Sequence, residues 1–226
     1  MLFRSEKVKE FNTRLNEKYK KLFEMDGKDI KRFIEDNIGQ IVQLEKLSHE
    51  ELEGFYSNGG VVGVDGSKNR IGGAYPHYVE IYQGLAKSSI SSNEPIFKAD
   101  YFTPLDDEFE LKTDEDTRGR EGLITDYKLS GIEVDVALES LKLYNPSVVI
   151  MDGSLIRYDI ECFEKWINLR RECEKRGVIL IGVIKDIKTN IVGEKLSELG
   201  ILEGMDNLYD REIMYGLLDY GEAVKI

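Results

Sequence analysis

The chain contains little cysteine, histidine or proline. Its 226 residues include two cysteines, two histidines and four prolines. Without a Cys-x-x-Cys pair or clustered histidines, the usual structural zinc sites are excluded. Cys162 and Cys173 fall in one predicted helix, about 16 Å apart along its axis, and so cannot form a disulfide within it. We expect a cytoplasmic protein.

Long apolar runs are also missing. No stretch approaches membrane-spanning length, and the first residues run directly into charged ones without a signal-peptide pattern. No Gly-rich phosphate-binding loop of the Walker type occurs. We therefore expect neither a membrane partner nor a P-loop nucleotide site.

Positive charge is in the minority. The chain has 31 Lys and Arg against 43 Asp and Glu, for a formal net charge of −12. Proteins that simply coat nucleic acid are more often basic, which argues against that class. A nuclease remains compatible, because acids that bind metal ions add negative charge that the cations offset. A basic partner protein could supply most of the affinity for DNA.

The remaining composition is that of a folded protein, with 41% hydrophobic and 33% charged residues. Apolar residues at three- and four-residue spacing predict a helix over residues 5–25. Further helices are expected over 28–36 and 47–57, the latter opened by a capping box of Ser48 and Glu51. We expect residues 1–57 to form an N-terminal helical extension of an α/β protein.

Residues 58–226 are typical of a single α/β domain. Strands are predicted over 61–65, 78–85, 96–102, 147–152 and 178–184, and helices over 120–144, 158–176, 191–199 and 208–218. The acid-rich stretch 106–116 is expected to be a solvated loop. Short early connections favour antiparallel pairing, and the later strand–helix–strand order favours a parallel crossover.

This order predicts a ribonuclease-H-like mixed sheet with flanking helices, in which the first and fourth strands are neighbours. Residues 72–75 leave the strand count open. If they form an extra strand, the strand at 147–152 is the fifth; if they are part of a hairpin arm, it is the fourth and lies beside the first.

The tripeptide Asp-Gly-Ser follows an apolar run twice, at residues 65–67 and 152–154. A strand that ends on an acid and turns on glycine delivers a carboxylate to the rim of a sheet. If the two strands are neighbours, Asp65 and Asp152 lie side by side, and their repulsion usually requires a cation between them. Alternatively, each aspartate only caps a turn. Ser67 and Ser154 either complete the turns or bind the acids.

Two carboxylates are too few for a two-metal site, which usually draws on three or four. The helix over 120–144 offers Glu133, Asp135 and Glu139. Glu133 is the first candidate, because it lies beside apolar positions expected to face the core. Asp210, at the start of the last predicted helix, is a further candidate metal ligand, although acids favour helix starts in any case.

A lysine follows the last predicted strand. Lys185 could hold a scissile phosphate or offset charge on a leaving group, or could be an exposed strand-end residue. Arg70 and Lys68 could touch a phosphate backbone or lie in a solvated hairpin. His49 and His77, on separate segments, do not suit a catalytic pair.

Taken in order, these motifs resemble those of the NurA nuclease family. The resemblance rests on residues 61–67, 132–133, 149–155, 181–186, 210–213 and 217–222. It implies a manganese-dependent nuclease of ribonuclease-H-like fold that acts on single- and double-stranded DNA with 5′-to-3′ exonuclease activity. It also implies work with the hexameric HerA ATPase in DNA end resection, and a dimeric, ring-like assembly.

By position in that family, Asp65, Glu133 and Asp152 would be the metal-binding acids and Lys185 a catalytic lysine. Family members usually continue well past the segment at 217–221, so we expect a shortened or a minimal member.

The motifs, together with the family resemblance, imply a DNA exonuclease and single-strand endonuclease that uses two Mn²⁺ or Mg²⁺ ions. A phosphotransferase of the actin-like or sugar-kinase-like class is one alternative, although that class needs more chain. A non-catalytic adaptor for a DNA-translocating ATPase is the other.

Overall fold

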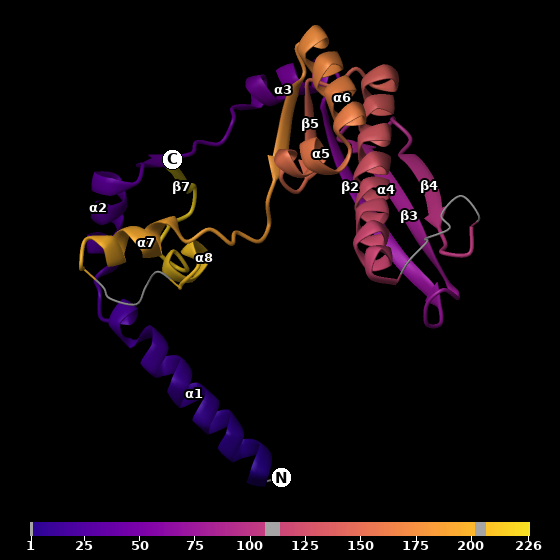
Figure 1. The fold of residues 1–226 in the computed structure, drawn as a ribbon. Coiled ribbons are helices and arrows are strands. Elements are labelled where there is room, and N and C mark those ends of the chain that lie inside the picture. Colours follow the sequence, from indigo (N-terminus) through magenta and orange to yellow (C-terminus); the bar gives the residue numbers. More distant parts are fainter. Residues whose placement is uncertain (1, 107–113, 202–206) are drawn as a thin grey trace. The chain divides into compact units, whose positions relative to one another are not determined.

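The computed structural model describes residues 2–106, 114–201 and 207–226. Its elements fall into two compact units (Figure 1). The first unit contains Met1–Lys46 and Asp186–Ile226, and the second contains Leu47–Lys185. The predicted boundary between residues 57 and 58 falls inside the second unit. The two units are defined by compactness and not by family membership, so the boundary between residues 57 and 58 stays a prediction.

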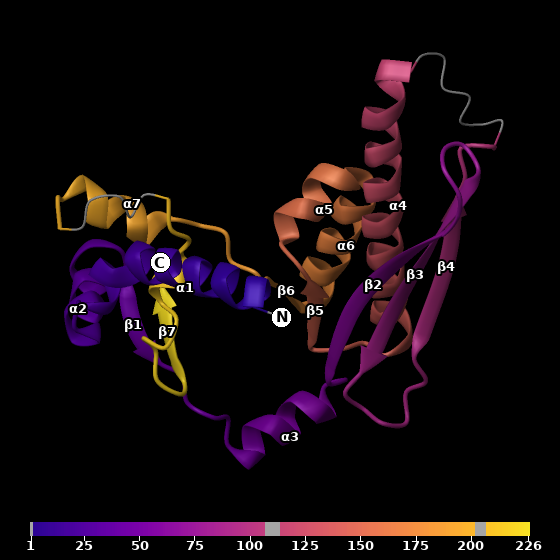
Figure 2. The same cartoon turned by 90° about the horizontal axis from the view of Figure 1, so that it is seen from below.

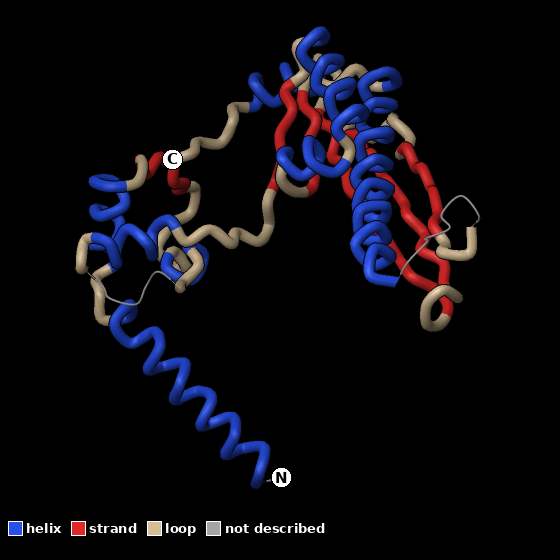
Figure 3. The backbone as a smooth tube through the Cα atoms, in the orientation of Figure 1, coloured by secondary structure: helices blue, strands red, loops and turns tan. Residues whose placement is uncertain are grey.

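A five-stranded mixed sheet forms the centre of the second unit (Figure 3). Its strands are β2 (Val61–Gly72), β3 (Tyr78–Ser88), β4 (Ile96–Phe102), β5 (Val148–Asp152) and β6 (Ile179–Val183). They lie in the order β4-β3-β2-β5-β6, with an antiparallel meander on one side and parallel pairs β2–β5 and β5–β6 on the other. The first strand of this sheet lies beside the fourth, which confirms the predicted ribonuclease-H-like fold.

Helices cover one face of this sheet, namely α4 (Asp114–Leu143), α5 (Leu155–Glu161) and α6 (Phe163–Arg176) (Figure 2). Burial alternates along β3, as expected for a sheet covered on one side. The core between sheet and helices includes Val62, Val64, Ala86, Val134, Val136, Val149, Met151 and Leu169. Helix α3 (His49–Ser57) precedes β2 and begins with the predicted capping box.

The opposite face of the sheet carries exposed apolar side chains. Residues on this face alternate with the core residues and include Phe97, Tyr101, Ile181 and Val183. Asp65 and Asp152 belong to the same set of alternate positions as these residues.

The prediction that the first Asp-Gly-Ser is a turn was wrong. β2 continues through it to Gly72, and Gly66 pairs with Gly84 of β3. Asp65 therefore lies within a strand, because hydrogen bonds along the whole β2–β3 ladder outweigh the local turn preference. Residues 73–75 form no strand, so β5 is the fourth strand of the sheet.

The second Asp-Gly-Ser does form the predicted turn. β5 ends at Asp152, and Gly153 has a φ of 102°, a conformation that favours glycine. Ser154 then caps α5, its hydroxyl accepting a hydrogen bond from the backbone N–H of Ile156.

The helix predicted over 158–176 is two helices, divided at Cys162, which has the non-helical angles φ −143° and ψ 49°. The change of direction lets Tyr158 and Trp166 stack, with ring centroids 5.6 Å apart. The two cysteines therefore do not share one helix. Both are buried and free, and burial raises the pKa of Cys162 to about 12 and of Cys173 to about 11.

The first unit has its own apolar core. Its elements are α1 (Leu2–Phe23), α2 (Gly27–Asn37), β1 (Gln40–Gln43), α7 (Ile191–Glu198), α8 (Asp210–Ile213) and β7 (Glu222–Lys225). Their core residues include Leu22, Ile34, Leu196, Leu208 and Ile213. The antiparallel pair of β1 and β7 was not predicted, and the helix predicted over 208–218 is only the short α8. A left-handed Gly216 (φ 72°) lies within that predicted helix.

The acidic loop predicted over 106–116 falls mostly outside the described residues, since 107–113 are not described. For residues 114–116 the prediction was wrong, because they form the start of α4. None of the described helices combines the length and the apolarity that a membrane crossing requires.

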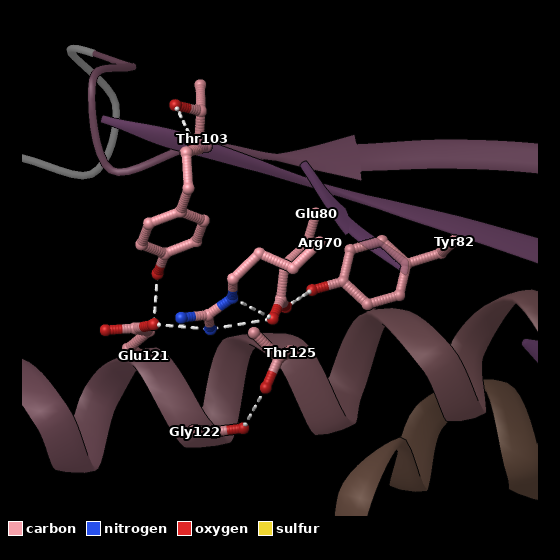
Figure 4. Close-up of polar contacts among 8 residues, drawn as sticks. Arg70, Glu80, Tyr82, Thr103, Glu121, Gly122 and Thr125 are labelled. Atoms are coloured by element: carbon pink, nitrogen blue, oxygen red, sulfur yellow. Dashed lines mark hydrogen bonds and ion pairs between the residues drawn. The ribbon is translucent and has the colours of Figure 1, made fainter. Parts of the chain in front are cut away.

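A polar network ties α4 to β2 and β3 (Figure 4). Arg70 donates to Glu80 from Nε at 2.9 Å and from Nη2 at 2.7 Å, and also to Glu121 of α4 at 3.0 Å. The Tyr82 hydroxyl donates to the other oxygen of Glu80. Burial opposes ionisation of Glu80, but hydrogen bonds from Tyr82 and Arg70 outweigh it and lower its pKa. Arg70, one of the two predicted phosphate contacts, is thus engaged within the fold.

We predict that Glu80→Gln lowers the free energy of unfolding by about 1–2 kcal/mol at neutral pH, because the half-exposed Arg70 loses the charge of Glu80 and keeps only Glu121. A carboxylate whose pKa is lowered by folding stabilises the protein above its unfolded pKa of about 4.3. That contribution is lost as the pH falls through the lower folded value. Urea unfolding from neutral pH to about pH 3 should give a difference between native and variant chains that shrinks with acid. A constant difference would contradict the prediction.

Candidate metal centre

Two of the predicted metal ligands lie next to each other on neighbouring strands. In the parallel pair β2–β5, Val64 lies opposite Met151. The residues that follow, Asp65 and Asp152, therefore lie side by side and point to the same face of the sheet. A hydrogen bond with the Asp65 carboxyl is among the influences that lower the pKa of Asp152. Both acids line a pocket of about 260 Å³.

Lys185 lines the same pocket and pairs with Asp152. Its Nζ lies 2.8 Å from Oδ2 of Asp152. This hydrogen bond is the largest influence lowering the pKa of Asp152, and it raises the pKa of Lys185 in turn. The lysine side chain is 72% exposed, so the ion pair is screened by water and contributes little to stability. The lysine can therefore exchange Asp152 for another anion at low cost.

Glu133 on α4 approaches β2 from the helix-covered side. It is 2% exposed, and a Cβ placed on Gly66 would lie 2.4 Å from its Oε1. Its Oε2 accepts hydrogen bonds from Arg157 and, at 2.7 Å, from the Tyr158 hydroxyl. Burial raises the pKa of Glu133 and the charge of Asp65 adds to this, while Tyr158 and Arg157 act in the opposite direction.

Within the described ranges, no group of three or more Asp, Glu, His or Cys side chains is arranged to hold one metal ion. Asp65 and Asp152 are together, and Glu133 lies near them with one oxygen engaged by α5. The other acids weighed on α4 are paired elsewhere, Asp135 with Lys165 at 2.6 Å and Glu139 with Lys98 at 2.8 Å.

Sequence reasoning missed Arg157 and Tyr158. Both lie in the first turns of α5, which begins directly after the second Asp-Gly-Ser. The Tyr158 hydroxyl also lies 3.0 Å from the backbone oxygen of Asp152. The position of these residues was the available signal, because a helix that starts at the end of a strand carries its first side chains close to that strand end.

Asp210 belongs to the first unit and is buried there. Its carboxylate accepts hydrogen bonds from the Thr189 hydroxyl at 2.6 Å and from the backbone N–H groups of Ile191 at 3.1 Å and Val192 at 2.8 Å. These bonds satisfy N–H groups at the start of α7. Asp210 is not part of the pocket described in the second unit, and its role as a metal ligand stays a prediction.

The residues of the pocket fit a hard divalent cation. Asp65 and Asp152 offer carboxylate oxygens, the ligands that Mg²⁺ and Mn²⁺ prefer. Mg²⁺ often keeps several waters and needs only one or two protein carboxylates. Because Gly66 has no side chain, Oε1 of Glu133 reaches β2 from the helix-covered side without obstruction, and the charge of Asp65 acts on this third carboxylate.

The ribonuclease-H-like sheet carries paired aspartates on adjacent parallel strands, with a glutamate on the covering helix and a lysine beside them. Together these residues define a candidate centre for metal-dependent phosphoryl chemistry. A family model described as the NurA domain matches residues 59–225. The chain belongs to the NurA family, a family of nucleases, which confirms the resemblance inferred from the motifs. No curated protein and no solved structure matches the chain.

We predict that Gly66→Ala destabilises the protein by about 1–3 kcal/mol, because the added methyl group displaces the buried Glu133 carboxylate. Gly63→Ala is the matched control, since a Cβ on that residue of the same strand meets nothing within 4 Å. Urea unfolding of both variants measures the difference. In a Glu133→Ala background the cost of Gly66→Ala should disappear, and a cost that persists there would assign the strain to another contact.

Proposed function

We propose that this chain is a metal-dependent deoxyribonuclease that acts as a 5′-to-3′ exonuclease and as an endonuclease on single strands. The observation that carries the proposal is the parallel pairing of β2 with β5, which sets Asp65 beside Asp152. Membership of a nuclease family supports a hydrolase. The proposed cofactor is a pair of Mn²⁺ ions, with Mg²⁺ as the alternative.

Asp65 and Asp152 would bind the ions, and Glu133 would be the third ligand. When bound, such ions lower the pKa of a water molecule to make a nucleophile and stabilise the charge on the leaving oxygen. Lys185, which is exposed and lies against Asp152, would donate to a phosphate oxygen of the substrate. Without a cation, Asp65 and Asp152 repel the phosphate backbone, so cleavage should depend strictly on metal.

The proposed partners are DNA, a hexameric HerA-type ATPase and a second copy of the chain, acting together in DNA end resection. Their support is family membership. The net charge of −12 is in keeping with a partner that supplies the positive surface for DNA.

The direct test is incubation of the purified chain with end-labelled single- and double-stranded DNA, in Mn²⁺, in Mg²⁺ and in chelator. We expect products only with metal, and a rate lowered at least about 100-fold in Asp65→Asn and in Asp152→Asn, because each change removes a carboxylate ligand. Asp159→Asn, which changes an exposed acid on α5, is the matched control and should retain the native rate.

The pattern of products separates the alternatives. Label released first from the 5′ end supports the proposed polarity, and cutting of circular single strands supports the endonuclease. Cleavage in chelator, or an unchanged rate in both aspartate variants, would contradict the proposal. A chain that binds an ATPase of the HerA type but never cleaves DNA would be an adaptor.

A further inference from the structure

Glu133 is held from one side only. The donors from α5, Arg157 and Tyr158, both contact Oε2, while Oε1 faces β2 at Gly66. One oxygen of the Glu133 carboxylate is thus bound by the guanidinium of Arg157, and the other is directed toward the strand that carries Asp65.

The hold of Arg157 on Glu133 is incomplete. Its Nη2 serves both Glu133 and the Tyr158 hydroxyl, the latter at 2.9 Å, but its Nε is buried without a hydrogen-bond partner. A buried N–H without an acceptor costs free energy. Its side chain is 30% exposed, and its Cζ would lie 3.8 Å from a Cβ on Gly153. The guanidinium therefore lies close to the end of β5, with room to move toward solvent.

Tyr158 has a second acceptor available. Its hydroxyl lies 2.7 Å from Oε2 of Glu133 and 3.0 Å from the backbone oxygen of Asp152. A hydroxyl has one proton and donates to one acceptor at a time. If Glu133 turns away, the hydroxyl can donate to the Asp152 carbonyl instead, so the Tyr158 hydroxyl itself still has an acceptor.

We propose that Arg157 is a positioning residue that takes the place of the metal at Glu133 in the metal-free protein, and that metal binding transfers Glu133 from Arg157 to Asp65 and Asp152. The inference rests on the proposed function, since it requires a metal ion at those two aspartates. Among the described residues no three acids are arranged around one ion, which is the arrangement expected while Arg157 engages the third. The released guanidinium then becomes available to a phosphate group of the substrate.

The test is the binding of Mn²⁺ to the full chain without DNA, measured from the electron paramagnetic resonance signal of the free ion. Arg157→Met removes the charge and keeps an unbranched side chain. Because the metal no longer competes with Arg157, we expect Mn²⁺ to bind about tenfold more tightly, equivalent to ~1.4 kcal/mol. If Arg157 only supports the fold, Mn²⁺ affinity stays the same or falls while stability falls, and either result overturns the inference.

A double-mutant cycle separates competition for Glu133 from simple repulsion between Arg157 and the ion. In a Glu133→Gln background the amide is a poor metal ligand, so Arg157→Met should no longer tighten Mn²⁺ binding. Tightening that persists in that background means that Arg157 acts by charge repulsion alone, and the inference fails.

The outcomes also distinguish this inference from the proposed function. A native chain that binds no Mn²⁺, or binds it equally well as Asp152→Asn, removes the metal centre itself. If the native chain binds Mn²⁺, Asp152→Asn loses that binding and Arg157→Met binds as the native chain does, then the metal centre stands and only the proposed role of Arg157 is contradicted. Circular dichroism checks folding, and if Arg157→Met does not fold, Arg157→Lys replaces it with an expected tightening of about threefold, because lysine lacks the planar fork.

Discussion

The parallel pairing of β2 with β5 is the constraint on which the candidate centre depends. It sets the carboxylates of Asp65 and Asp152 side by side on one face of the sheet. On the other face the same register buries Val62, Val64, Val149 and Met151 under the helices. A slip by one residue would expose these apolar side chains and bury the acids, so the hydrophobic core holds the carboxylates in register.

Each acid of the centre has a different environment. Asp65 is exposed, Asp152 is partly exposed and paired with Lys185, and Glu133 is buried and paired with Arg157. The protein therefore supplies positive charge from its own side chains to two of the three acids, which lessens their mutual repulsion when no metal is bound. The Lys185–Asp152 and Arg157–Glu133 pairs differ in how easily they separate. The exposed lysine exchanges its partner easily, whereas the buried Glu133 carboxylate gives up the partly exposed Arg157 only for another cation.

Local patterns predicted most elements but missed those whose partners are distant. Apolar periodicity located β5, β6 and the end of α4 closely, although α4 begins at Asp114, before the predicted start at residue 120. It missed β1 and β7, because each has four residues and finds its only described strand partner almost two hundred residues away. The Asp-Gly-Ser pattern wrongly predicted a turn at Asp65–Ser67, because it reflects only the local preference of Gly66. The hydrogen-bond ladder to β3, which keeps β2 extended, involves residues further along the chain. Arg157 was missed because its place at the start of α5 indicates only the nearby strand end, and not the glutamate of α4 that it contacts.

The amino-acid sequence by itself determined which residues could carry the chemistry, the α/β class of the fold and, through the order of its motifs, the family. Residue type and periodicity are local properties, and they can be read without coordinates. Only the tertiary structure decided that β5 is the neighbour of β2, that Glu133 faces Arg157 and Tyr158, and that Asp210 is engaged at the start of α7. These contacts join residues far apart along the chain, so they depend on strand order and on helix packing that no local pattern encodes.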